Sequence, residues 1–239
     1  HLTRHIFPHS RHLSQLLIVL AFTSLVLAYL QPQIGQEPEF IGQPGVEIMI
    51  AIDVSTSMLA QDMKPSRLEF AKTKIIQLLN LVNNDGIGLI VFAGSSYIQS
   101  PLTTDYSSIK TFLLSIDSTT VSHSGSEIRR AIQLAIDHFS EQTVDSRLTI
   151  EQRKKILVFV SDGEDHSQVA LETAKIAKEH EVRIYCLGIG QPDIGSPIPV
   201  YNEQGRLYGY KKDQKGNVVV SKLNEKLLKG IAETTGGSY

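Results

Sequence analysis

The stretch VEIMIAIDVSTS at residues 46–57 decides the fold of this 239-residue chain. Its first seven residues are an almost unbroken apolar run that ends at Asp53, as expected of a strand covered on both faces. Three more apolar runs follow, at residues 86–93, 155–160 and 182–189. Helical patterns separate these runs, and the alternation predicts an α/β fold with a doubly wound, mostly parallel sheet and helices on both faces.

The helical patterns have recognisable starts and apolar stripes. Ser66 and Glu69 form a capping-box pattern, after which apolar residues recur at helical spacing as far as Val82. Similar patterns predict a short edge strand at 97–99 and helices at about 105–116, 126–139 and 167–180.

Residues 198–221 interrupt this alternation. Short strand-like pieces (IPVY, RLYGYK and NVVVS) are separated by two turn sequences, which predicts a small antiparallel β insertion before a last helix at 223–234. We therefore expect one α/β domain over residues 46–239 that contains this insertion.

The first 45 residues are organised differently. Residues 1–12 form a basic segment, residues 13–30 are apolar without a charge, and residues 31–45 are rich in Pro and Gly. A helix needs ~20 residues to cross a bilayer, so we predict one transmembrane helix at 13–30 and an extended linker at 31–45. A core helix and a cleaved signal peptide are the alternatives; the apolar segment lacks the polar face of the first and a small-x-small cleavage site for the second.

The charges that flank the apolar segment predict its orientation. Arg4 and Arg11 precede it, whereas residues 31–45 contain Glu37 and Glu39 but no Lys or Arg. By the positive-inside tendency, the N-terminal flank is cytoplasmic and the following domain lies outside. Because the chain starts with His1, we expect it to be part of a longer protein.

Composition excludes several classes of function. The 23 Lys and Arg residues against 25 Asp and Glu give a formal net charge of −2, so no basic field would hold a nucleic acid. Cys186 is the only cysteine, which excludes an internal disulfide framework and a cysteine-cluster zinc site.

Oxygen-bearing side chains gather where predicted strands end. Asp53, Ser55 and Ser57 follow the first strand, Asp162 follows the strand at 155–160, and Ser126 begins the helix between them. Ligands of open α/β sheets bind at the carboxyl ends of strands, and alternate residues leaving a strand can turn toward one point. Carboxylates and hydroxyls suit a hard cation such as Mg²⁺.

These motifs resemble the metal-ion-dependent adhesion site of von Willebrand factor type A domains. More narrowly, the chain is similar to the bacterial Bat family of membrane-anchored, aerotolerance-associated proteins. The stretches that carry this similarity are LQPQIG after the apolar segment, DVSTSMLAQDMKPSRLEFAK, VFAGSSYIQSPLTTDY, VSDGEDH and IGSPIPVY. The resemblance implies a Mg²⁺ site, with Mn²⁺ or Ca²⁺ as alternatives, in which Ser55, Ser57 and Ser126 bind through their hydroxyls. Asp53 and Asp162 would act largely through water, which leaves one position for a partner's Asp or Glu. The family usually has Thr-Asp where this chain has Ser126-Glu127.

The resemblance also implies a setting for the protein. We expect a non-enzymatic interaction module in the bacterial inner membrane, with its domain on the periplasmic side and in an envelope complex linked to stress and oxygen tolerance. The implied partners are sibling Bat proteins, together with a functional link to a MoxR-type AAA+ ATPase.

Two other functions remain open on the sequence. A haloacid-dehalogenase-type phosphotransferase would use Asp53 as nucleophile and Asp162 as a Mg²⁺ ligand, but it would need a second Asp where Ser55 stands. A structural scaffold would have a vestigial metal site and bind its partner edge-on through the β insertion.

Overall fold

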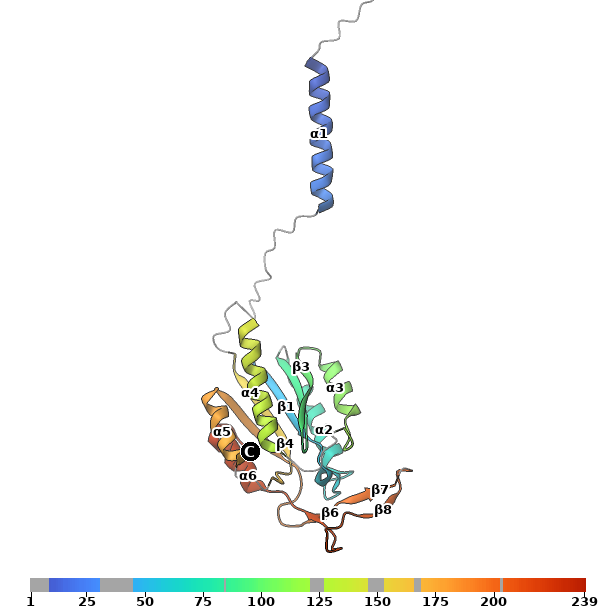
Figure 1. Ribbon diagram of the computed structural model, residues 1–239, viewed down its shortest axis with the longest axis vertical. Coiled ribbons are helices and arrows are strands. Elements are labelled where there is room, and N and C mark those ends of the chain that lie inside the picture. Colours follow the sequence, from blue (N-terminus) through green and yellow to red (C-terminus); the bar gives the residue numbers. More distant parts are fainter. Residues whose placement is uncertain are drawn as a thin grey trace, which may run out of the picture. The chain divides into compact units, whose positions relative to one another are not determined.

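The computed structural model describes residues 9–30, 45–83, 85–120, 127–145, 153–165, 169–202 and 204–239. The chain divides into two compact units, His1–Gly42 and Gln43–Tyr239. The first unit contains helix α1 (His9–Leu30), and the second contains every other element (Figure 1).

The described side chains of α1 leave large apolar groups exposed, among them Leu16, Ile18 and Phe22. Among the described residues, no helix combines the length and the apolar character required of a membrane span.

The second unit is built on a five-stranded sheet with the order β3-β2-β1-β4-β5. Its strands are β1 (Glu47–Asp53), β2 (Gly86–Phe92), β3 (Ser96–Thr103), β4 (Lys155–Ser161) and β5 (Val182–Gly188). All neighbours pair in parallel except β3, which runs antiparallel to β2 at one edge. The predicted mostly parallel sheet is confirmed, and the edge strand is longer than the three residues that the sequence predicted.

Helices cover both faces of this sheet (Figure 1). One face carries α2 (Arg67–Leu79) and α3 (Tyr106–Ser115), and the other carries α4 (Ile128–Asp145), α5 (Val169–Glu179) and α6 (Glu225–Thr235). Each face has its own apolar core, as the buried, nearly continuous apolar strands require. The predicted cap of α2 is present, because the Ser66 side chain accepts a hydrogen bond from the Glu69 backbone N–H.

The segment predicted as one antiparallel unit forms two small sheets. Strand β6 (Ser196–Pro197) pairs with β9 (Val220–Ser221), and β7 (Pro199–Tyr201) pairs with β8 (Leu207–Tyr210). Prolines 197 and 199 lack the N–H needed for a continuous ladder, which explains the break between β6 and β7. We call residues 191–224, which join β5 to α6 and contain both small sheets, the insertion.

The last residues lie against the outer strand of the sheet. The Cys186 backbone N–H donates to the Ser238 carbonyl at 3.0 Å. At Gly237 the tail comes so close that a Cβ would lie 2.0 Å from the Ile184 carbonyl oxygen. Only glycine therefore allows this approach.

Candidate metal centre

The carboxylate of Asp53 is fixed at the carboxyl end of the sheet. Strands β1 and β4 are neighbours, which places the end of β1 beside Ser161 at the end of β4. Asp53 is fully buried; its Oδ2 accepts from the Ser161 hydroxyl at 2.7 Å and its Oδ1 from the Ser55 backbone N–H at 2.9 Å. Both carboxylate oxygens of Asp53 are therefore engaged by the protein.

Two serine hydroxyls lie together in the loop that follows β1. This loop turns into a short 3₁₀ helix, η1 (Thr56–Leu59), which brings Ser55 Oγ within 2.9 Å of Ser57 Oγ. Both serines are buried, whereas the intervening Thr56 turns its hydroxyl to Lys211, whose ammonium donates to it at 2.9 Å. The structure therefore brings the hydroxyls of Ser55 and Ser57 together and turns that of Thr56 elsewhere.

Asp162 completes the described part of the candidate site. Its buried carboxylate accepts from Arg67 Nη1 at 3.0 Å and from the Glu164 backbone N–H at 3.1 Å. Burial, and then the nearby charge of Asp53, raise the pKa of Asp162 to about 7, while a hydrogen bond with Ser57 works in the opposite direction. Two buried carboxylates close together, of which Asp162 pairs with Arg67, favour a further cation at this site.

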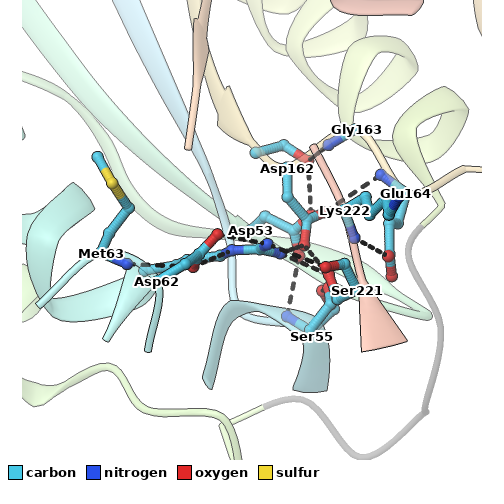
Figure 2. A network of polar contacts seen from close by, with 12 residues as sticks. Asp53, Ser55, Asp62, Met63, Asp162, Gly163, Glu164, Ser221 and Lys222 are labelled. Carbon is cyan, nitrogen blue, oxygen red and sulfur yellow. Dashed lines mark hydrogen bonds and ion pairs between the residues drawn. The ribbon is translucent and has the colours of Figure 1, made fainter. Parts of the chain in front are cut away.

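Arg67 is the main site residue that the sequence analysis missed. Its side chain is fully buried and binds Asp62 through Nε at 2.8 Å and Nη2 at 2.9 Å, while Nη1 contacts Asp162 and the Ser221 hydroxyl. Figure 2 labels these three partners, Asp62, Asp162 and Ser221. Burial acts to lower the pKa of Arg67, but its carboxylate partners outweigh this effect and raise it, so the guanidinium stays charged.

A sequence signal for Arg67 did exist. It shares the helical stripe of Ala71 and Ile75, which face the core, and an arginine on such a stripe needs an internal anion. Its partners Asp162 and Ser221 lie 95 and 154 positions away, so the pairing itself could not be predicted.

The insertion is attached to the site loops at both ends. At its start, the Gln191 backbone N–H donates to Asp62 at 3.0 Å. At its end, the Lys222 N–H donates to Glu164 at 3.0 Å (Figure 2). The Asn224 N–H donates to the Asp162 carbonyl at 2.8 Å. The sheet, η1 and the insertion thus form one hydrogen-bonded assembly around the candidate site.

The middle loop is described only in part. Ser126 lies outside the described residues. Its neighbour Glu127 donates its backbone N–H to the Ala93 carbonyl at 2.8 Å, just beyond the end of β2, and its carboxylate pairs with Arg130. This part of the chain therefore reaches the same edge of the sheet as Asp53.

The donor set fits a hard cation. Over the described ranges there is no group of three or more His, Cys, Asp or Glu side chains able to hold a metal ion. The candidate site instead combines two buried carboxylates, from Asp53 and Asp162, with the hydroxyls of Ser55 and Ser57. All of these donors are oxygens, as Mg²⁺ or Mn²⁺ prefers.

Comparisons with known proteins agree with this geometry. The family model for the von Willebrand factor type A domain matches residues 48–164. The structure of the BatB protein from Bacteroides thetaiotaomicron is 42% identical, covers 82% of this chain and 89% of its own, and superposes with a TM-score of 0.72. The chain belongs to the Bat-like family of von Willebrand factor type A domain proteins.

Further relatives extend this family assignment. An aerotolerance-related membrane protein from Bacteroides fragilis is 40% identical over 82% of this chain and 90% of its own, with a TM-score of 0.73. A manganese-loaded TRAP protein from Plasmodium vivax shares the fold, at 18% identity over 62% of this Bat-like chain and 58% of its own, with a TM-score of 0.50.

The Bat-like chain spans only part of its curated relatives. A protein of Borreliella burgdorferi is 28% identical over 74% of this chain, which corresponds to 50% of that relative. A UPF0353 protein of Mycolicibacterium gilvum is 27% identical over 95% of this chain and 63% of its own length.

Proposed function

We propose that this domain is a metal-dependent protein-interaction module that binds a carboxylate of a partner protein. The hydroxyls of Ser55, Ser57 and Ser126 would hold a Mg²⁺ ion, and Asp53 and Asp162 would hold its coordinated waters. The ion, when bound, supplies an electrophilic position for an Asp or Glu side chain of the partner.

The observation that carries this proposal is the way the two carboxylates are already engaged. Asp53 accepts hydrogen bonds at both oxygens, and so does Asp162. Carboxylates that the protein already holds in this way suit contact with a metal through its coordinated waters better than direct coordination. The neutral hydroxyls of Ser55 and Ser57 then become the natural direct ligands.

Neutral direct ligands favour recognition of an anion. An ion held by hydroxyls keeps more of its positive charge than one held by three carboxylates, so an incoming carboxylate gains more. The glutamate at position 127, directly before α4, pairs with Arg130 in the first turn of that helix. The manganese-loaded relative from Plasmodium vivax has the same fold, which supports a divalent cation in this position.

We infer that no covalent chemistry occurs here. A phosphotransferase would need the Asp53 carboxylate free to attack, whereas Asp53 is fully buried and bonded to Ser55 and Ser161. A phosphotransferase would also need an acid two residues later, where Ser55 stands. Phosphatase activity abolished by Asp53→Asn would revive the enzymatic alternative.

The cellular setting is part of the same proposal. The exposed apolar residues of α1 support an inner-membrane anchor, and the relative from Bacteroides fragilis is described as a membrane protein. The flanking charges support a periplasmic domain. We propose sibling Bat proteins as partners in an envelope complex, with a functional link to a MoxR-type ATPase.

Calorimetric titration of the purified chain with Mg²⁺ and Mn²⁺ tests the metal site. We expect saturable binding that is lost in Asp53→Ala and in Ser57→Ala, while Ser107→Ala, at an exposed position on α3, binds as the wild type does. Circular dichroism would establish that each variant is folded. Metal binding that both site variants retain would contradict the proposed ligand set.

A partner pull-down separates the module from a scaffold. The proposed function requires partner capture to be lost in EDTA and restored by Mg²⁺. Capture that EDTA leaves unchanged would favour a scaffold with a vestigial site.

A further inference from the structure

A groove lies between the insertion and the loop that follows η1. Its volume is about 560 Å³. One wall is formed by Gln61 and Asp62, and the other by the insertion, mainly through Ile194, Pro197, Pro199, Tyr201, Leu207 and Tyr210. The Gln61 amide donates to the Tyr201 hydroxyl at 2.9 Å and so ties one wall to the other.

Much of the apolar wall is accessible. Ile194 is 65% exposed, Leu207 is 54% exposed, and Tyr201 and Tyr210 are each more than 40% exposed. Tyrosine and aliphatic side chains of this kind anchor protein contacts, because they bury much apolar area and the tyrosine hydroxyl keeps a polar contact. The groove therefore suits an apolar side chain of a partner.

The charges around the groove favour an acidic partner. Residues 191–224 contain five basic and three acidic residues, although the whole chain carries a net charge of −2. Asp62, the acid in the groove wall, is already paired with Arg67. Among the described residues, neither Arg206, Lys211 nor Lys212 takes part in an ion pair.

Lys211 links the groove to the candidate metal centre. It directly follows Tyr210 of the groove wall, and its ammonium donates to the hydroxyl of Thr56, the residue between Ser55 and Ser57 in the chain. Lys211 therefore connects the groove wall to the loop that carries the two candidate serine ligands.

We propose that the groove binds an acidic peptide segment of the partner protein and seats one of its aliphatic or aromatic side chains. An Asp or Glu of the same segment points to Lys211 and the metal centre. This inference rests on the proposed function, whose metal site supplies the carboxylate contact, and it adds the chemistry that distinguishes one acidic partner from another.

The test begins with a random dodecapeptide display library. The 239-residue chain in detergent micelles with Mg²⁺ is the target, and empty micelles remove peptides that bind detergent. We expect the selected peptides to combine an acidic residue with an aliphatic or aromatic one. Selected peptides that lack acidic residues would overturn the proposal.

Fluorescence anisotropy of a selected peptide then locates the binding surface. We expect Leu207→Ser and Tyr210→Ala each to weaken binding about tenfold, which corresponds to about 1.4 kcal/mol. Leu81→Ser is the matched control, because Leu81 is 80% exposed and follows α2 at the opposite end of the sheet. Unchanged affinity in both groove variants would overturn the proposal.

A second pair of variants tests whether the positive charge of Lys211 contributes to peptide binding. Lys211→Ala should weaken the peptide several-fold, whereas Lys215→Ala, in a turn of the same insertion, should leave the affinity within twofold of the wild type. Equal effects of the two variants would mean that only the net charge matters, and this would overturn the role of Lys211.

Peptide binding measured with and without EDTA distinguishes this inference from the proposed function. Binding that is sensitive to EDTA but not to the groove variants would leave the metal-dependent module standing and overturn the groove. Binding that is sensitive to the groove variants but not to EDTA would support the groove and contradict the metal-dependent module. A chain dimer that Leu207→Ser dissociates in sedimentation equilibrium would make a second copy the occupant and overturn the peptide proposal.

Discussion

Arg67 joins three segments that are far apart in the chain. Its guanidinium contacts Asp62 after η1, Asp162 after β4 and Ser221 in β9, and water does not reach it. A buried charge of this kind is stable only while its partners remain, because each ion left alone would bear the cost of its lost hydration. The candidate metal centre therefore depends on a residue that is not itself a candidate ligand.

Replacing Arg67 by methionine should destabilise the domain strongly. Arg67→Met leaves two buried carboxylates without their cation, and we expect the free energy of unfolding to fall by about 3–5 kcal/mol. Urea denaturation followed by circular dichroism measures this change. Arg130→Met is the control, because it breaks an exposed pair with Glu127 that should contribute about 1 kcal/mol or less. A similar small loss in both variants would contradict the structural role of Arg67.

A buried histidine outside the site gives a pH-dependent prediction. Burial lowers the pKa of His138 below its usual 6.5, although Glu141 and Glu47 favour its charged form. Below pH 6.5 the unfolded chain therefore binds a proton that the folded chain does not, and stability falls as the pH decreases. His138→Gln should show a smaller loss of thermal stability between pH 7 and pH 5. An unchanged pH dependence in this variant would mean that His138 does not contribute.

It was easier to predict which residues lie near the candidate site than to predict which residues each of them contacts. Asp53, Ser55, Ser57 and Asp162 could be predicted to lie at one edge of the sheet because they stand at or shortly after the carboxyl ends of two buried strands. The hydrogen bond by which the Ser161 hydroxyl holds Asp53 could not be predicted, because a serine after the apolar run 155–160 does not show which carboxylate it binds.

The elements of the sheet and its helices follow closely from the sequence, whereas the insertion does not. Buried parallel strands are apolar throughout and amphipathic helices are periodic, so both patterns are strong. The insertion has short strands with exposed side chains, and the contacts of Gln191, Lys211 and Ser221 with the site loops fix it in place. Such contacts between distant segments leave no periodic pattern in a sequence.

The close packing of the residues after α6 against strand β5 can be tested by substitution. Gly237→Ala would place a Cβ against the Ile184 carbonyl of β5, so the tail must shift and the free energy of unfolding should fall by about 1–3 kcal/mol. Gly209→Ala in β8 is the control, since a Cβ there meets nothing within 4 Å. Equal stability of the two variants in urea would show that the tail does not pack on β5 in solution.

At the scale of the whole molecule, the two units have contrasting surfaces. The Gln43–Tyr239 unit encloses two apolar cores, one on each face of its sheet, whereas the described side chains of α1 are exposed apolar groups. Exposed apolar groups at this density are unfavourable in water, and the proposed membrane anchor would place them in the lipid bilayer.

Cell fractionation tests the proposed anchor. We expect the full chain to remain in the membrane pellet after carbonate extraction, and a chain starting at residue 43 to enter the soluble fraction. Protease added to spheroplasts should then digest the domain. Full chain in the soluble fraction would contradict the anchor, and a domain protected until lysis would contradict its periplasmic placement.

The attachment of the insertion to the site loops has a consequence for exchanging parts between relatives. An insertion grafted onto another Bat-like domain would bring Ser221 and Lys211 but leave Arg67, Asp62 and Thr56 behind. The recipient would then have to supply the matching half of each contact. If the insertion binds the partner, as proposed, its specificity should be transferable only when the contacting residues at the sheet edge are exchanged together with the insertion. We therefore expect the insertion and these sheet-edge residues to vary together among members of the family.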